Sequence, residues 1–422
     1  MKSKYIPRIS DAKLALALEA MGAVLIEGPK WCGKTRSAEE FAGSVLYMQD
    51  PDTFDENILK VKTKPSLLLE GETPRLLDEW QVAPVLWNAV RFAVDKRQKT
   101  GQFILTGSVV PVRTDDMHSG TGRISRMKMR TMSLYESAES TGEISLGDIY
   151  SGKTEMFGKS KIILEQMAFI LTRGGWPAAV NESSGRVALK RAYDYYEAVV
   201  NEDISRVDSV EKSTDRVRSL MCSLSRNISS EASTTTIMND MVVNDKSLSQ
   251  VTIDQYISAL KKLFVIDDLP AWSPNLRSKT AIRTTAKRHF SDPSIATAAL
   301  GATTERLFND FHTFGLLFEA LCIRDLRVYA DSLDGNVYHY RDAKGTEIDA
   351  IIQLADGRWG AIEVKMGAGD IEDAAEKLIK FSNSIDYEKM SKPSFLMIIT
   401  ATEFAFRMEN GVWVVPLACL KN

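Results

Sequence analysis

The N-terminal part of the chain alternates short apolar runs with segments of helical spacing. Apolar runs lie at 23–26, 45–48, 76–77 and 103–105, and residues 9–21 have the pattern of an amphipathic helix. Short apolar runs bounded by turn residues are typical of strands that are buried on both faces. Strands that alternate with helices predict a parallel sheet with covering helices.

The remainder of the chain changes its pattern twice. Residues 161–227 are mostly helical in spacing, with breaks at 174–177 and 183–185, and a long amphipathic helix is expected at 249–264. Apolar positions then follow a strand pattern, and turns that contain glycine separate the runs. The three strands expected there lie at 338–341, 347–352 and 359–365.

The first apolar run leads into a stretch with the spacing G-x-x-x-x-G-K-[ST], the P-loop pattern. Two glycines allow the backbone to turn its N–H groups toward phosphate, Lys34 can reach the β- and γ-phosphates, and Thr35 carries a hydroxyl suited to Mg²⁺. A chance glycine turn before a helix is the alternative, which the flanking strand and helix disfavour. The expected nucleotide-binding residues are Gly28, Pro29, Lys30, Trp31, Cys32, Gly33, Lys34 and Thr35.

Two later strands are predicted to end in polar residues that complete this site. Asp78 and Glu79 follow an apolar pair, where Asp78 is expected near Mg²⁺ and Glu79 is expected to polarise the attacking water. Ser108 follows the run at 103–105 and can contact the γ-phosphate or the water. An ordinary strand end with solvated acids is the alternative for the first pair, and a strand-to-turn boundary is the alternative for Ser108.

These motifs resemble the AAA superfamily, in its branch of prokaryotic single-chain ATPases with an uncharacterised C-terminal region. The stretches 122–124, 130–136 and 174–177 are also similar to that branch, although Thr131 stands where the branch more often has proline. The resemblance implies ATP and Mg²⁺ as cofactors. Arg123 opens a basic run and is the arginine we select to act on the nucleotide, as arginines do in related ATPases. A solvated basic face is the equal alternative.

Composition limits the partners of the protein. The 422 residues carry a net charge of −3, so any contact with nucleic acid must come from local basic patches. The four cysteines are far apart in the sequence, which suggests neither structural zinc nor a disulfide framework. The chain opens with no signal peptide and has no apolar stretch long enough to cross a bilayer, so we expect no membrane contact and a cytoplasmic protein.

One basic patch follows a segment that resembles a winged helix. Residues 233–269 suggest a compact helix-turn-helix, and residues 275–290 would then form the wing. Such a wing could contact the phosphate backbone of DNA. The alternative is a basic hairpin that packs against another domain. The basic residues of the patch are Arg277, Lys279, Arg283, Lys287 and Arg288.

The three C-terminal strands carry the pattern D-x13-E-x-K, formed by Asp349, Glu363 and Lys365. This pattern resembles the PD-(D/E)xK nuclease superfamily, although Ile348 stands in place of the proline, and Glu319 takes the place of the helical acid. Two carboxylates on adjacent strands can hold a Mg²⁺ ion that activates water, with Lys365 positioning that water. A sheet with a solvated, salt-bridged face is the alternative, and retained nuclease activity is left open.

The turn between the last two of these strands decides whether the two acids can share a metal. A two-residue turn at Asp356-Gly357 would place Asp349 opposite Val364, whose side chain points to the other face. A three-residue loop at 355–357 would place Asp349 opposite Glu363. That loop type favours a left-handed residue in third place, where Gly357 stands, so we predict the three-residue loop.

The sequence therefore predicts an α/β chain of four segments. They are an AAA-type P-loop ATPase with a parallel sheet at 1–158, a helical linker at 159–230, a winged helix at 231–296 and a restriction-endonuclease-like domain at 297–422. The expected function is ATP hydrolysis coupled to DNA binding, with a metal-dependent nuclease whose activity stays open. The main alternative is an ATP-driven switch that binds DNA or protein and cuts nothing. A small-molecule kinase is disfavoured because no substrate lid is recognisable.

Overall fold

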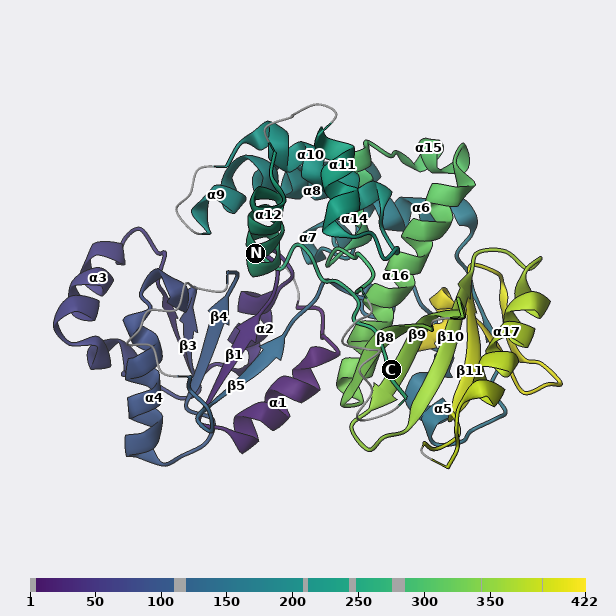
Figure 1. Ribbon diagram of the computed structural model, residues 1–422. Coiled ribbons are helices and arrows are strands. Elements are labelled where there is room, and N and C mark those ends of the chain that lie inside the picture. The colour runs from purple at the N-terminus through teal and green to yellow at the C-terminus, as the bar shows by residue number, and fades with distance from the viewer. Residues whose placement is uncertain are drawn as a thin grey trace. The chain divides into compact units, whose positions relative to one another are not determined.

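The computed structural model describes residues 5–109, 119–207, 212–242, 248–274, 285–342, 344–388 and 390–422. The chain forms two compact units. The first contains residues 1–131 with two short later segments, 203–211 and 259–265, and the second contains the remainder. Figure 1 shows the helices and strands of both units. None of the helices described has the length and hydrophobicity needed to cross a bilayer.

The first unit is built on a five-stranded sheet in the order β2-β3-β4-β1-β5, and all of its strand pairs are parallel. The predicted parallel sheet is confirmed. Because parallel strands end at the same edge, the residues that follow β1, β3 and β4 come together at one edge of the sheet. The strands are β1 (Ala23–Glu27), β2 (Ser44–Tyr47), β3 (Arg75–Asp78), β4 (Phe103–Gly107) and β5 (Ile124–Lys128).

Both faces of this sheet are buried, which explains why its strands appear as continuous apolar runs rather than alternating ones. Leu25, Leu77 and Leu105 pack on the face covered by α4. Val24 and Ile104 pack on the opposite face, against α1 and α2 (Figure 1). The helices of the unit are α1 (Ser10–Ala20), α2 (Lys34–Phe41), α3 (Phe54–Thr63), α4 (Val85–Arg97) and the short α9 (Ile204–Arg206).

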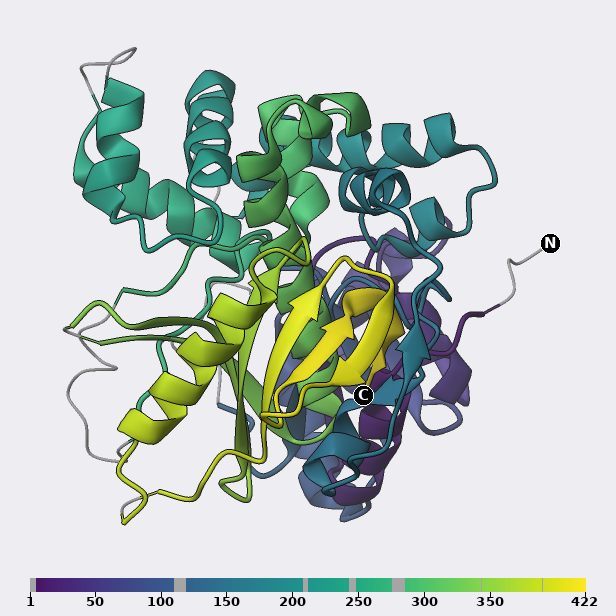
Figure 2. The same ribbon diagram turned by 90° about the vertical axis from the view of Figure 1, so that its right-hand side faces the viewer.

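The second unit contains a seven-stranded mixed sheet in the order β7-β12-β13-β11-β10-β9-β8. β8, β9 and β10 form an antiparallel meander, whereas β10 and β11 are parallel and α17 (Ile371–Ser384) connects them. α17 lies along one face of the sheet (Figure 2), where Trp359, Phe381 and Trp272 form an aromatic core. α16 (Phe311–Ser332) packs against β8, β9 and β10. The strands are β7 (Gly158–Lys159), β8 (Gly335–Arg341), β9 (Glu347–Leu354), β10 (Trp359–Lys365), β11 (Phe395–Thr400), β12 (Phe404–Arg407) and β13 (Trp413–Pro416).

Helices dominate the part of the second unit that precedes this sheet, in agreement with the sequence pattern. The breaks predicted at 174–177 and 183–185 fall between α6 and α7 and between α7 and α8. The helices are α5 (Leu146–Tyr150), α6 (Leu164–Arg173), α7 (Pro177–Val180), α8 (Gly185–Ala198), α10 (Thr214–Arg226), α11 (Thr234–Val242), α12 (Gln250–Lys262, of which residues from 259 on belong to the first unit), α14 (Pro293–Leu300) and α15 (Thr304–Phe308).

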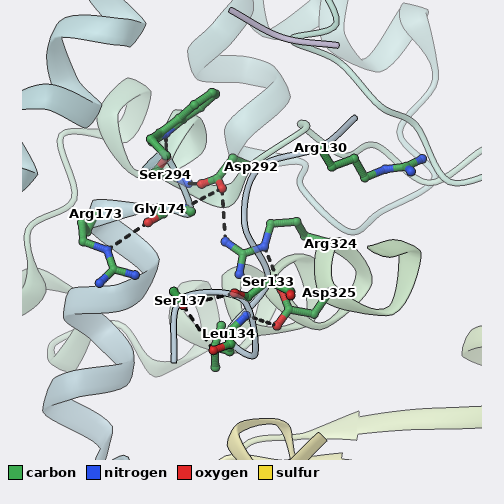
Figure 3. Close-up of polar contacts among 12 residues, drawn as sticks. Arg130, Ser133, Leu134, Ser137, Arg173, Gly174, Asp292, Ser294, Arg324 and Asp325 are labelled. Atoms are coloured by element: carbon green, nitrogen blue, oxygen red, sulfur yellow. Dashed lines mark hydrogen bonds and ion pairs between the residues drawn. The ribbon is translucent and has the colours of Figure 1, made fainter. Parts of the chain in front are cut away.

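Two of the family-like stretches in the sequence meet in a buried ion-pair cluster of the second unit (Figure 3). Arg324 on α16 contacts Asp292 at 3.2 Å and Asp325 at 2.6 Å, and all three side chains are buried. Asp325 accepts a hydrogen bond from the backbone N–H of Leu134, and Asp292 accepts one from that of Gly175. The stretches 130–136 and 174–177 thus have a structural role in connecting loops to α16.

The pKa values of these two acids are shifted in opposite directions, although burial raises both. Burial raises the pKa of Asp325 to about 6, although Arg324 opposes the shift. For Asp292, burial is outweighed by Arg324 and by hydrogen bonds from Ser294 and Gly175, which hold the pKa below its usual range. A Cβ at Gly175 would lie 2.2 Å from the carbonyl oxygen of Met132, so only glycine fits at that point of the cluster.

The expected ATPase segment, 1–158, extends past the first unit. Residues 132–158 belong to the second unit, where β6 (Ile144–Ser145) pairs with β14 (Leu420–Lys421) and β7 pairs with β12. The division of the chain into four segments stays a prediction.

Candidate functional site

The P-loop residues connect the carboxyl end of β1 to the start of α2. Gly33 has a φ of +105°, and a Cβ at Gly28 would lie 2.1 Å from the carbonyl oxygen of Met129, so both positions require glycine. Lys34 is buried and donates hydrogen bonds from Nζ to the carbonyl oxygens of Gly28 at 3.0 Å and Pro29 at 2.8 Å. These acceptors are neutral, so they leave the charge of the ammonium uncompensated.

The two acids at the end of β3, Asp78 and Glu79, accept hydrogen bonds from hydroxyl groups, one of them from the P-loop. Asp78 Oδ1 accepts hydrogen bonds from the hydroxyls of Thr35 and Thr106, both at 2.6 Å. Glu79 Oε2 accepts a hydrogen bond from Ser108 Oγ at 3.0 Å. The structure therefore brings together the loop threonine, both acids and the polar end of β4.

The backbone of Glu79 is in an uncommon conformation. Its φ of +54° and ψ of +45° lie in the left-handed region, where residues other than glycine are uncommon. The N–H of Glu79 donates to Thr106 Oγ1 at 3.2 Å, and the side-chain amide of Gln81 donates to its carboxylate. Such conformations cost about 1–3 kcal/mol and are concentrated at functional sites.

A pocket of about 580 Å³ opens over the P-loop, within the size range of ligand sites. It is lined by part of the predicted site: Lys30, Trp31, Gly33, Lys34, Thr35, Glu79 and Ser108. Asp203, Arg206 and Leu263 also line it, although they stand far along the sequence. Asp203 Oδ1 contacts Lys30 Nζ at 2.5 Å, which fixes this later segment to the P-loop.

The other predicted residues of this site lie elsewhere. Cys32 is fully buried beneath the loop, with its Sγ directed to the carbonyl oxygen of Met129. Asp78 reaches the pocket through Thr35 rather than lining it. Arg123 donates to Asp95 at 2.8 Å with about half of its side chain exposed, and it does not line the pocket.

Several residues of the site were not selected from the sequence, among them Thr106, Gln81, Asp203 and Arg206. Thr106 stands inside the polar end of β4, which the sequence had marked, and Gln81 follows the two acids closely. Asp203 and Arg206 carried no sequence signal, because only the fold brings them to the P-loop.

The β9–β10 hairpin has the predicted register. Leu354 donates its N–H to the carbonyl oxygen of Arg358, and Gly357 has a φ of +88°, so the loop contains three residues. Ile362 pairs with Ala350, which places Glu363 opposite Asp349 at the next position. The predicted three-residue loop is confirmed.

The acid groups on this face are contacted by lysines. Lys287 Nζ lies 3.0 Å from Glu319 Oε1, 3.0 Å from Glu347 Oε1 and 3.7 Å from Asp349 Oδ1, and its side chain is only 2% exposed. Burial, together with the nearby Asp349, raises the pKa of Glu319 to about 8. The three acids outweigh the effect of burial on Lys287 and raise the pKa of its ammonium. Glu319, Glu347, Asp349 and Lys287 are called the carboxylate cluster below.

Glu363 is the fourth acid on this face and has lysine partners of its own. It is fully buried, with Lys377 Nζ 2.8 Å and Lys365 Nζ 3.5 Å from its carboxylate oxygens. Burial and the charge of Asp349 raise the pKa of Glu363 to about 7. In the part of the chain that the structure describes, no three His, Cys, Asp or Glu side chains are arranged to hold a metal ion.

The prediction that a basic wing contacts DNA is wrong for Lys287 and Arg288, the two of its basic residues that the structure describes. Lys287 belongs to the carboxylate cluster, and Arg288 contacts Asp268 at 3.1 Å and the carbonyl oxygen of Ala232. The side chain of Lys287 is 2% exposed and that of Arg288 is 11% exposed, so neither presents a free charge to a DNA backbone. Arg277, Lys279 and Arg283 lie outside the described residues.

Comparisons with known proteins match three regions of the chain. Residues 21–138 match the family described as AAA domain, which supports a P-loop ATPase-like N-terminal region. Residues 164–306 match a domain of unknown function, DUF8612, and residues 314–420 match another, DUF4143. Neither description assigns a chemistry to those regions.

Two solved structures that match this chain are remote from it in sequence. A Walker-type ATPase of Pyrococcus abyssi is 13% identical, with 71% of this chain and 97% of that chain covered and a TM-score of 0.43. A STAND signal-transduction ATPase of Pyrococcus horikoshii with a tetratricopeptide repeat sensor is 14% identical, with 79% of this chain and 51% of that chain covered and a TM-score of 0.24. A search of curated proteins found no match.

Proposed function

We propose that the protein hydrolyses ATP at the P-loop pocket and uses the reaction as a switch. The observation that carries the proposal is the contact of 2.6 Å between Thr35 Oγ1 and Asp78 Oδ1, beside the ammonium of Lys34. A hydroxyl and a carboxylate are the hard oxygen ligands that Mg²⁺ takes in nucleotide sites, with phosphate oxygens and water completing its shell. These residues fit the ion, which would neutralise charge on the phosphates.

The remaining residues have roles that follow from their positions. Lys34 and the N–H groups at the start of α2 bind phosphate, because both present positive charge to the same space. Glu79 orients and polarises the attacking water, and Ser108 holds its carboxylate in place. Arg206 lines the pocket and is better placed than Arg123 to contact a phosphate.

Replacing Glu79 with Gln tests this proposal. The amide keeps the shape of the side chain but cannot accept a proton, so ATP binding is retained and turnover is lost. Binding is measured by calorimetry and turnover by phosphate release. Glu19→Gln, on the exposed surface of α1, is the matched control. Normal phosphate release from Glu79→Gln would refute the role of this residue.

For the second unit, the observations support a nuclease-like fold that does not cleave DNA. The order α16-β8-β9-β10-α17-β11, with Asp349 opposite Glu363, supports a restriction-endonuclease-like arrangement. Cleavage is disfavoured because lysines already contact all of the candidate metal ligands. This favours the switch over the nuclease, with DNA or a protein as the partner of the second unit.

Incubation of the purified protein with plasmid DNA, Mg²⁺ or Mn²⁺, and ATP separates these two functions. We expect ATP to be hydrolysed while the plasmid stays intact. Cleavage that disappears in Glu363→Gln would restore the nuclease. A winged helix formed by α11 and α12 stays a prediction, which retardation of labelled duplex DNA at low salt would test.

A further inference from the structure

We propose that the ammonium of Lys287 takes the place of a divalent metal ion in the carboxylate cluster, so that the second unit binds no divalent cation there. This inference rests on the proposed restriction-endonuclease-like fold, because that fold family implies a metal between a helical acid and the acids of a hairpin. In this chain those acids are Glu319, Asp349 and Glu363.

The distances show that the lysine and a metal ion require the same space. Mg²⁺ binds oxygen atoms at about 2.0–2.1 Å and takes six of them. Lys287 Nζ lies at hydrogen-bonding distance, 3.0 Å, from one oxygen each of Glu319 and Glu347. A metal ion bound to the same oxygens would overlap with the ammonium. Since the side chain of Lys287 is 2% exposed, it is packed in the interior with its charge among the acids.

The carboxylates of Asp349 and Glu363 are also engaged. Asp349 Oδ2 accepts a hydrogen bond from the N–H of Val364 at 2.9 Å, and Oδ1 faces Lys287. Glu363 presents both of its oxygens to Lys377, at 2.8 and 2.9 Å. Three lysines thus face four acids on this side of the sheet, so the negative charge that would attract a divalent ion is largely neutralised.

The backbone fixes Lys287 in this position. Its N–H donates to the carbonyl oxygen of Leu269, and the N–H of Leu269 donates back to the carbonyl oxygen of Lys287, both at 2.9 Å. The N–H of Asp267 donates to the carbonyl oxygen of His289 in the same ladder. α16 and β9 supply the acids that contact Lys287 on this short ladder. The lysine is therefore a built part of the cluster.

If the ammonium replaces a metal ion, its removal should create a metal site. Lys287→Met keeps an unbranched side chain of similar length but removes the charge, which leaves three acids without their cation. Mn²⁺ is the probe, because its binding is measured directly by the loss of the free-ion signal in electron paramagnetic resonance. All proteins carry Asp78→Asn, which removes an acid of the P-loop, and no nucleotide is added.

We expect no bound Mn²⁺ at millimolar concentration with Lys287 present. Lys287→Met should bind one Mn²⁺ at least tenfold more tightly, and the further change Asp349→Asn should abolish that binding. Stoichiometric Mn²⁺ binding by the protein with Lys287 present, lost in Asp349→Asn, would overturn the proposal even if Lys287→Met did not fold. A folded Lys287→Met that bound no Mn²⁺ would overturn it as well. Since the readout needs no ATP turnover, its failure is distinct from a failure of the ATPase proposal.

Discussion

The P-loop pocket and the carboxylate cluster contain the same residue types, but the lysine charge is available to a ligand in the first and neutralised in the second. Each contains a buried lysine and carboxylates held by the end or the length of a strand, but Lys34 donates to backbone carbonyls whereas Lys287 donates to acids. Carbonyl oxygens carry no net charge, so the field of Lys34 reaches the open pocket. The charge of Lys287 is cancelled by its neighbours. What a lysine can bind therefore depends on the charge of its partners more than on its burial.

The largest effect is expected when the internal cation is removed. Lys287→Met removes the cation that three acids share, and breaking a buried ion pair in this way costs about 3–5 kcal/mol. Urea unfolding at pH 7 in the absence of divalent ions measures the loss. Lys377→Met is the matched control and should cost about 1 kcal/mol or less, because Lys377 is partly exposed and Lys365 remains beside Glu363. Equal losses would show that the two lysines are equivalent.

The next effect concerns the lysine that faces the pocket. Lys34→Ala should lower ATP hydrolysis by about 100- to 1000-fold, the usual result when a group that stabilises transition-state charge is removed. Steady-state phosphate release gives the measurement. Lys30→Ala serves as control, since Asp203 already pairs with its ammonium, and less than about a tenfold loss is expected. A Lys34→Ala enzyme with more than a tenth of normal activity would contradict the comparison.

Acid should destabilise the second unit through a histidine beside the cluster. Burial, helped by Lys287, lowers the pKa of His339 to about 4. The folded chain therefore keeps this ring neutral while the unfolded chain protonates it below about pH 6.5, so stability is lost as the pH falls from 6.5 to 4. Between pH 7 and 5 the protein should lose about 2 kcal/mol more stability than His339→Gln. Parallel curves for the two proteins would remove His339 from the pH response.

A smaller effect distinguishes two arginines. Arg206→Gln should reduce ATP hydrolysis about tenfold, or about 1.4 kcal/mol, because this side chain lines the pocket. Arg123→Gln should leave it within about twofold, because Asp95 holds Arg123 away from the pocket. Both rates come from the same phosphate-release assay. The reverse order would return Arg123 to the nucleotide site.

Local rules explain which parts could be predicted from the sequence. The P-loop depends on glycines and a strand–helix order that lie within one short stretch, and the hairpin register depends on the left-handed Gly357. Lys287 could not be placed in the same way, because a run of basic residues does not show which acids it will meet. Its partners come from α16 and β9, and only the fold brings them near. Asp203 reaches the P-loop for the same reason.

The pairing of β14 with β6 has a consequence for the order of folding during synthesis. Every strand of the parallel sheet lies between Ala23 and Lys128, so that sheet can form as soon as this stretch has left the ribosome. Ile144 on β6 must wait for Leu420 on β14, and Ser145 donates a hydrogen bond to the carbonyl oxygen of Asn422. At about 5–20 residues per second, roughly 15–60 seconds of translation separate the two events. During that interval the nascent chain carries a formed parallel sheet and an incomplete second unit. The exposed apolar faces of the second unit are the expected binding sites for chaperones.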